Sequence, residues 1–368
     1  MALYVRKCGR RTRFAGGRLA VGRKRNLAAE GDRRAPKDQR GHRTAAGGLA
    51  KPQVTSYVFW TMVQINQTIV TEFLLLGFGD LHHFRILLFI VFLIIHILAL
   101  VSNILVIVLI VVMQSLHSAM YFFLSQLSLS ELIFTSNIVP TMLWLVLVGG
   151  GKISISRCIV QLYLLAVPAI SQCLLLASMS FDRYVAICRP LHYATIMTFS
   201  RQVLIVTICW VVGFMVSFVL YLLLDRLEFC GTNTINHFYC DIPPVVELTC
   251  AKNRSAELVI SMLCFPFLAC PCLFIMATYI SIIHAIQKIT STSGRQKAFS
   301  TCSSHLTVVG LYYGSLGSTY VFPPDKSSFN VNKGLSLLFT LVTPLINPLI
   351  YSLRNQEMRT AINKLIHL

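Results

Sequence analysis

Three ionisable residues lie inside or at the edge of long apolar stretches. Glu131 is the single acid in the stretch 119–147, and Asp182 and Arg183 stand side by side where the stretch 158–181 ends. A charge at membrane depth is costly unless it is paired or reaches water, so such residues are candidates for a functional site. An Asp-Arg pair also occurs where a helix simply leaves the membrane, so residue type alone leaves both interpretations open.

The polar segment 225–255 offers a second kind of chemistry. His237, Cys240 and Asp241 have metal-ligand spacing in the run HFYCD, which would suit copper or zinc. The chain has no CxxC pair at zinc-finger spacing. GxSxG, HExxH, P-loop and GxGxxG motifs at a strand-to-helix turn are also absent, and the acids are too few and too dispersed for a paired carboxylate site. We therefore expect a protein that is not an enzyme and uses no cofactor.

Long apolar stretches must position these residues. The chain is 55% hydrophobic and 12% charged, whereas an average soluble domain is about 45–50% apolar and about 25% charged. A helix that spans a membrane needs about 20 mostly apolar residues. Stretches of this kind are 86–112, 119–147, 158–181, 202–224, 258–287, 298–322 and 334–353. The sequence predicts an all-α membrane protein built as a bundle of seven transmembrane helices.

The net charge of +18 is unevenly distributed. Residues 1–60 contain 15 Lys or Arg and three Asp or Glu, with almost no apolar periodicity. This composition predicts a disordered basic extension over residues 1–61. Nucleic-acid binding by this extension is disfavoured because no fold and few aromatics accompany the charge. A second methionine, Met62, leads to the hypothesis that the mature protein begins there.

The orientation in the membrane follows from a sequon and from the cysteines. Asn66 opens an Asn-Gln-Thr sequon just before the first span, and glycosylation occurs only on the lumenal side. Four cysteines lie at ends of apolar stretches or in the polar segment, and they are the disulfide candidates: Cys158, Cys230, Cys240 and Cys250. Both features predict an extracellular N-terminus, although Lys and Arg counts barely decide the matter and the basic extension favours the opposite orientation.

Four motifs in this order resemble those of the olfactory receptor family, within the rhodopsin-like G-protein-coupled receptors. They are LHSAMYFFLS at 116–125, MSFDRYVAIC at 179–188, KAFSTCSSHL at 297–306 and PLINPLIY at 344–351. The resemblance covers residues 62–368. It implies an extracellular tail at 62–85, the seven-helix domain at 86–353, and a cytoplasmic tail at 354–368 with a short amphipathic helix. It also implies a multi-pass protein of the plasma membrane.

The resemblance assigns a switch to the cytoplasmic end of the bundle. In the resting state Asp182 pairs with Arg183, and helix separation frees Arg183 to face a heterotrimeric G protein, as in other two-state elements. Pro348 permits a kink in the seventh span. The remaining implied switch residues are Tyr184, Tyr279, Asn347 and Tyr351.

A polar core and two disulfides are also implied. Glu131 stands where the family usually has Asp and pairs with Asn103, while Gln172 replaces a frequent second acid, which makes a sodium site doubtful. Ala119 is a further departure from the family pattern. The implied disulfides are Cys158 with Cys240 and Cys230 with Cys250. Because Cys240 is then engaged, we expect no metal at the HFYCD run.

The expected ligand is a small, mostly apolar volatile odorant in an enclosed apolar pocket. Leu165 occupies the place where an amine receptor would carry a carboxylate, so amines are disfavoured. The expected partners are the odorant, an olfactory-type stimulatory G protein that raises cyclic AMP, and membrane lipid. A transporter or channel is compatible with seven spans but would show a polar helix face or paired half-helices. The pocket positions carried over from the family are Leu165, Ala166, Ala169, Ile170, Phe267, Leu316, Gly317 and Tyr320.

Overall fold

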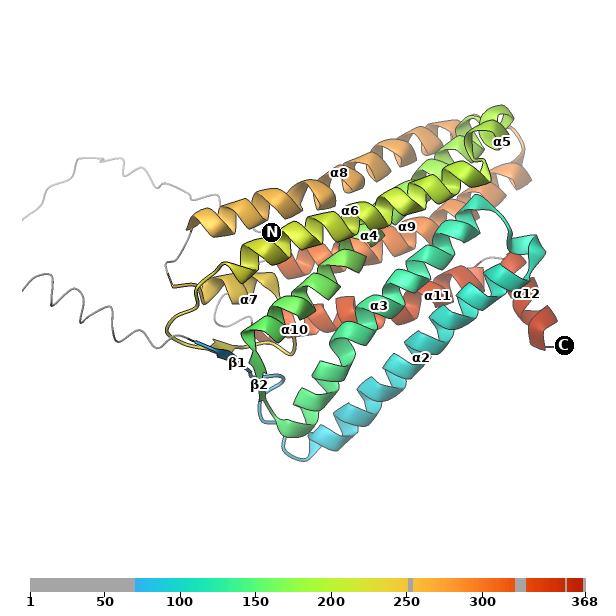
Figure 1. Cartoon of the computed structure of the whole chain (residues 1–368). Coiled ribbons are helices and arrows are strands. Elements are labelled where there is room, and N and C mark those ends of the chain that lie inside the picture. The colour runs from blue at the N-terminus through green and yellow to red at the C-terminus, as the bar shows by residue number, and fades with distance from the viewer. Residues whose placement is uncertain (1–69, 251–253, 322–328, 355, 367–368) are drawn as a thin grey trace, which may run out of the picture. The chain divides into compact units, whose positions relative to one another are not determined.

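A computed structural model describes residues 70–250, 254–321, 329–354 and 356–366. The predictions about the extension 1–61, Met62 and Asn66 lie outside the described residues, as does the side chain of Tyr320. Long helices lie side by side over the described part of the chain (Figure 1). They are α2 (Phe84–Val112), α3 (Ala119–Val148), α4 (Ile155–Cys188), α6 (Phe199–Asp225), α8 (Arg254–Gln287), α9 (Thr292–Val321), and a final segment of α10 (Phe329–Leu337), η3 (Leu338–Val342) and α11 (Thr343–Arg354).

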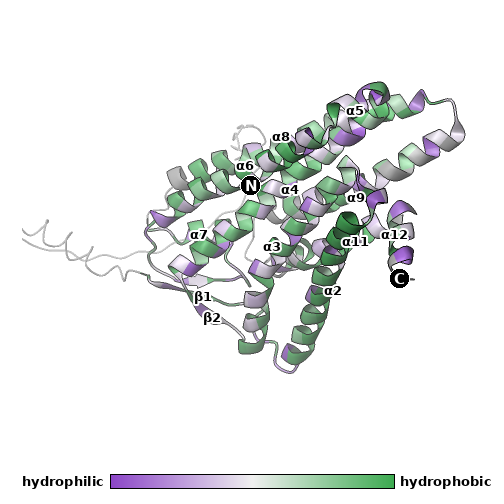
Figure 2. Ribbon diagram, turned by 45° about the vertical axis from the view of Figure 1, so that its right-hand side comes forward, coloured by the Kyte–Doolittle hydropathy of each residue, from purple (hydrophilic) through white to green (hydrophobic). Residues whose placement is uncertain are grey.

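These helices have the length and composition of membrane spans. Six of the described segments are long and apolar enough to cross a membrane, the last counted as Val331–Ser352. The exception is α9, whose first half, TSGRQKAFSTCSSHL, is rich in Ser, Thr and charged residues. Figure 2 shows hydrophobic residues along α2, where Ile94, Val101 and Val111 are exposed. Lipid is the solvent that suits such a surface, and the predicted seven-helix bundle is confirmed.

Helix α4 is longer than the predicted span 158–181. It begins at Ile155, where the Ser154 hydroxyl caps it by accepting a hydrogen bond from the Arg157 backbone N–H at 3.4 Å. It continues to Cys188, past Asp182 and Arg183. The predicted span ends at residue 181 because the charge-free stretch stops at Asp182. The helix itself can continue, because only its membrane-embedded part must be apolar. The acid and the base are therefore held on a rigid helix rather than on a loop.

A small β-sheet at one end of the bundle adds to the predicted all-α fold. Strand β1 (Glu72–Leu75) pairs antiparallel with β2 (Gly151–Ser154) and parallel with β3 (Thr234–Ile235). β1 precedes the first long helix, and the other strands lie in the loops after α3 and α6. The short helix α7 (Ile242–Glu247) follows β3. We call this end of the bundle the sheet end.

The opposite end carries short helices that join or follow the long ones, and we call it the α12 end (Figure 1). They are η1 (Gln114–Leu116), η2 (Pro190–His192), α5 (Tyr193–Ile196) and α12 (Gln356–Ile366). α12 is amphipathic, since Met358 and Ala361 are buried while hydrophilic residues mark its other face (Figure 2). Tyr121 anchors it by donating a hydrogen bond to Glu357 Oε2 at 2.7 Å. The predicted amphipathic helix is confirmed.

Helix α6 approaches α4 closely at Gly213. A Cβ atom on Gly213 would lie 2.3 Å from Ser171 Oγ and 2.9 Å from the Val167 backbone oxygen. The Ser171 hydroxyl is itself hydrogen-bonded to the backbone oxygens of Val167 and Cys209, at 2.9 and 3.3 Å. A side chain at position 213 therefore requires both the hydroxyl and a helix backbone to move.

We expect Gly213→Ala to destabilise the bundle by about 1–3 kcal/mol, as overpacking of a close contact does, although alanine favours the helix itself. Thermal unfolding of detergent-purified protein, followed with a thiol dye that reports exposure of buried cysteines, measures the change. Gly314→Ala in α9 is the matched control because a Cβ there meets no atom within 4 Å. Equal unfolding temperatures for the two variants would contradict the prediction.

Candidate functional site

The Asp182–Arg183 pair at the α12 end is part of a larger polar group. Arg183 Nε donates to Asp182 Oδ2 at 2.9 Å, and Nη2 contacts the same oxygen. The other carboxylate oxygen accepts a hydrogen bond of 2.8 Å from the Tyr193 hydroxyl. Asp182 is 0% exposed and the Arg183 side chain 16% exposed. The carboxylate therefore has a partner on each side and holds Arg183 along its own helix.

Sequence reasoning missed Tyr193. It lies in α5, eleven residues after Asp182, and no local pattern indicates that the loop returns to the helix it has just left. Burial, with the Asp182 charge nearby, raises the pKa of Tyr193. The phenol therefore remains a hydrogen-bond donor at neutral pH. Tyr184, a predicted switch residue, is half-buried and stacks on Phe181 with ring centroids 6.4 Å apart.

The predicted tyrosines of the switch are buried near the same end. The Tyr279 hydroxyl is 2.7 Å from His305 Nδ1, and their rings are stacked. Tyr351 is 4% exposed, and its hydroxyl makes no hydrogen bond within the described residues. Tyr279 is therefore engaged with His305 rather than with Tyr351. A buried hydroxyl that lacks a partner is costly, so Tyr351 gains free energy from any rearrangement that supplies one.

The polar core joins three helices in the middle of the bundle. Asn347 Nδ2 donates to Glu131 Oε1 at 2.5 Å, which links α11 to α3. Asn103 Nδ2 donates to the backbone oxygens of Ala99 and Pro344, both at 3.0 Å, which links α2 to α11. Pro344 O belongs to the turn before Pro348, where the helix ladder is interrupted. The residues predicted as polar core and the Asn347-Pro348 motif thus form one cluster.

The run His237–Asp241 forms a plug across the sheet end. A disulfide joins Cys240 to Cys158 at the start of α4, and the Cys240 backbone N–H donates to Gln161 Oε1 at 3.0 Å. His237 Nε2 is 3.2 Å from Ser336 Oγ on α10, and Phe238 stacks on Phe78 with centroids 5.0 Å apart. The plug is therefore tied to α4, α10 and the segment after β1.

Two disulfides are present in the part of the chain that the structure describes, and they are the pairs that the resemblance implies. Cys230–Cys250 closes the same loop with Cα atoms 4.6 Å apart. Because Cys240 is bonded to Cys158, its thiol is not available to a metal beside His237. Over the described residues, no group of three or more His, Cys, Asp or Glu side chains is arranged to hold a metal ion.

Burial of His237 makes the stability of the protein depend on pH. Burial, with the Lys333 charge acting in the same direction, lowers the pKa of His237 from 6.5 to about 3. Unfolded protein then binds more protons than folded protein between these two values, so stability falls as the pH drops below 6.5.

We expect the sheet end to lose about 2 kcal/mol of stability between pH 6.5 and about pH 5. The same thermal unfolding measurement at both pH values tests this, with His237→Phe as the variant, because phenylalanine stays uncharged and keeps the ring contacts. His83→Gln, an exposed histidine at the same end, is the control. An unchanged pH dependence in His237→Phe would contradict the assignment.

The predicted pocket residues lie on three of the long helices, α4, α8 and α9. Leu165, Ala166 and Leu316 are buried, and the remaining described ones are half-buried. A Cβ atom on Gly317 would meet nothing within 4 Å, so space is open beside this part of α9. The Ala169 backbone oxygen accepts a hydrogen bond from Tyr312 at 2.7 Å.

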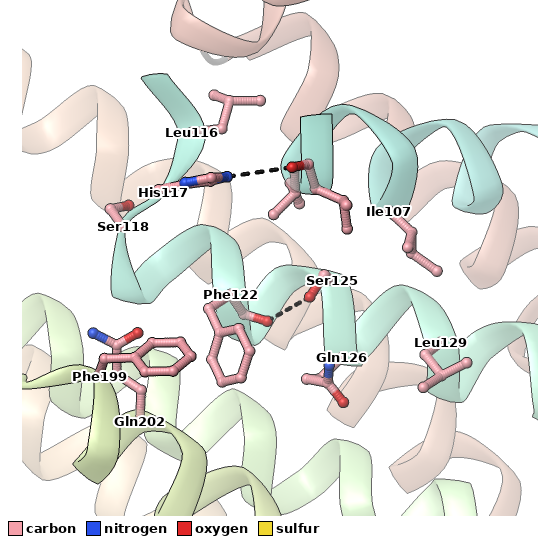
Figure 3. A pocket seen from close by; sticks show the side chains of 12 residues that line it. Ile107, Leu116, His117, Ser118, Phe122, Ser125, Gln126, Leu129, Phe199 and Gln202 are labelled. Carbon is pink, nitrogen blue, oxygen red and sulfur yellow. Dashed lines mark hydrogen bonds between the residues drawn. The ribbon is translucent and has the colours of Figure 1, made fainter. Parts of the chain in front are cut away.

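A separate cavity of about 490 Å³ lies near the α12 end, between α2, α3 and α6. Figure 3 shows Phe122, Phe199 and Leu129 beside it, with His117 and Gln126 as polar neighbours. None of the predicted pocket residues lines this cavity. It is therefore distinct from the predicted odorant pocket.

Comparison with known proteins identifies the family. A profile described as olfactory receptor matches residues 92–367. Olfactory receptor 11L1 of Homo sapiens is 43% identical over 302 residues, which cover 82% of this chain and 94% of that protein. Olfactory receptor 2D2 of Homo sapiens is 44% identical over 303 residues, 82% of this chain and 98% of that protein. The Asp182–Arg183 pair, the polar core and these similarities agree: the chain belongs to the olfactory receptor family, multi-pass membrane proteins that are G-protein-coupled receptors and not enzymes.

Proposed function

We propose that the protein binds a small, mostly apolar volatile in the half of the bundle nearer the sheet end. The pocket consists of the residues carried over from the family on α4, α8 and α9. Leu165, Ala166 and Leu316 supply apolar lining, and the open space beside Gly317 gives room for a ligand. Such a site suits a ligand with few hydrogen-bonding groups.

The sheet end faces the outside of the plasma membrane in this proposal. Two disulfides lie at that end, and disulfides persist in oxidising compartments. Residues 62–85 then form an extracellular tail that includes β1, and residues 354–368 a cytoplasmic tail that includes α12. Membrane lipid contacts the exposed apolar faces of the long helices.

Ligand binding activates a heterotrimeric G protein of the olfactory stimulatory type and raises cyclic AMP. The observation that carries this proposal is that Asp182, itself hydrogen-bonded by Tyr193, holds Arg183 at the α12 end. When the helices separate, Arg183 leaves Asp182 and faces the G protein. Asn347, Pro348 and Tyr351 transmit the change from the polar core, while Tyr279 changes partner from His305.

The full chain, expressed in cells with a cyclic-AMP reporter and exposed to a panel of volatiles, tests the proposal. We expect a concentration-dependent rise with at least one volatile, absent from mock-transfected cells. Antibody staining of an epitope tag verifies delivery to the cell surface. The proposal would be contradicted if the receptor reaches the cell surface but none of the volatiles raises cyclic AMP, while a direct activator of adenylyl cyclase works normally in the same cells.

A further inference from the structure

Lys333 is a buried cation that belongs neither to the predicted switch nor to the polar core. It lies in α10, in the first turn of the last span, and is 8% exposed. Among the residues whose side chains are described, it is the one Lys or Arg that is buried. A lysine at the end of a span normally extends its ammonium group to water. Its burial here is therefore a feature that requires an explanation.

Some other buried ionisable side chains have partners that the structure shows. Asp182 is paired with Arg183, and Glu131 accepts a hydrogen bond from Asn347. No described carboxylate lies within 4.0 Å of the Lys333 ammonium group. A buried charge without a counter-ion is expensive. The site is therefore suited to a negatively charged group that arrives from outside the described chain.

The surroundings of Lys333 place it beside the plug. Ser336 lies three residues later on the same helix, so both side chains occupy one face. Ser336 faces His237 of the plug, and the plug is bonded to α4 through Cys240 and Gln161. The ammonium group is near enough to His237 to affect its titration. Lys333 thus lies on the face of α10 that packs against the plug.

We propose that Lys333 binds the carboxylate of an aliphatic acid odorant, whose apolar tail extends toward Leu165, Ala166 and Gly317. This inference rests on the proposed function and names the ligand class for it. A carboxylate supplies the missing counter-charge and accepts charge-assisted hydrogen bonds, which are about twice as strong as neutral ones. The buried Ser336 hydroxyl is a second group able to donate to it. Neutral alcohols satisfy only the hydrogen bonds, and amines add a second positive charge.

The test compares straight-chain acids, aldehydes, alcohols and amines of equal length on the full-length receptor. Acids are expected to give the lowest half-maximal concentrations in the cyclic-AMP assay. Lys333→Gln is expected to raise the value for acids about tenfold or more, as loss of a hydrogen bond to a charged group does. Lys333→Arg keeps the charge and is expected to retain much of the acid response. Lys152→Gln is the matched control, an exposed lysine at the same end.

A second readout separates this inference from the proposed function. Thermal unfolding of the purified receptor measures acid binding without signalling, so acids that stabilise the wild type but not Lys333→Gln support the site even if cyclic AMP never rises. A wild-type receptor that responds to alcohols but not to acids, with alcohol responses that Lys333→Gln leaves intact, would overturn the acid site. The proposed receptor function would then still stand. Aldehyde responses that depend on Lys333, in the absence of acid responses, would also overturn it.

An acid in the neighbouring loop provides the last control. Asp325 lies in the segment 322–328, outside the described residues, and is the acid closest to Lys333 in sequence. Asp325→Asn is expected to leave acid binding unchanged or to strengthen it, because it removes a competing negative charge. A loss of acid binding equal to that of Lys333→Gln would show that Lys333 serves a structural ion pair, and would overturn the inference.

Discussion

Arg183→Ala is expected to abolish the ligand-dependent rise in cyclic AMP while ligand binding at the sheet end persists. The guanidinium is held by Asp182 in the described conformation. In the proposed function it is the group that the active state presents to the G protein. Its removal deletes a contact made only in the active state, so signalling falls but the pocket is untouched. Cyclic-AMP assays in cells and ligand-induced thermal stabilisation of the purified variant measure the two effects separately.

Tyr193→Phe is the variant with the opposite expected sign. It removes the 2.8 Å hydrogen bond to Asp182 and leaves the ring in place. A net loss of about 1 kcal/mol from the resting state shifts a two-state equilibrium about fivefold toward the active state. Basal cyclic AMP should therefore rise. Equal losses of signal in both variants would show that the polar group has a structural role only.

Loss of the Cys158–Cys240 disulfide is expected to produce the second large effect. The bond joins residues 82 apart in sequence, whereas Cys230–Cys250 joins residues 20 apart. In the chain-entropy model the longer loop contributes about 4–5 kcal/mol and the shorter about 3 kcal/mol. The first bond also fixes the plug over α4, so its removal should lower both stability and ligand response.

The paired double variants Cys158→Ser with Cys240→Ser and Cys230→Ser with Cys250→Ser test this directly. Surface delivery, measured by flow cytometry of a tagged receptor, should fall further in the first than in the second. The thermal unfolding temperature should follow the same order. A greater loss in the second double variant would show that local distortion, rather than loop length and plug placement, decides the outcome.

Hydropathy predicted the long helices well because a membrane span must be apolar over about 20 residues. It gave the third span, 158–181, but not the full helix, which continues through Asp182 and Arg183 because a helix need not be apolar once it leaves the lipid. The predicted last span, 334–353, begins one residue after Lys333. Hydropathy does not reveal that this lysine is buried, nor that its helix contacts the plug through His237 and Ser336, which are 99 residues apart in sequence.

Contacts between distant segments explain the other omissions. Strands of four, four and two residues are too short for a periodic pattern to reveal them, and their pairing partners lie up to 160 residues apart. The return of Tyr193 to Asp182 depends on the fold of the intervening loop. The resemblance of the motifs predicted the residues of the switch, the polar core and the disulfide pairs, because residues of unusual type stand at those positions. Tyr193 and Ser336 carry no such mark.

The small sheet can assemble only in a fixed order during synthesis of the receptor. β1 is made first, but its neighbour β2 follows two long helices later and β3 follows four. An even number of crossings separates the three strands, so all of them reach the same side of the membrane only if every intervening helix is inserted. In the proposed orientation β1 therefore waits in the lumen for β2, and its other edge stays unpaired until residue 235 has been translocated. If the first segment of a nascent chain stays in the cytosol, β2 and β3 lack their central strand. The sheet then cannot form, and its unpaired strands are exposed to quality control in the endoplasmic reticulum.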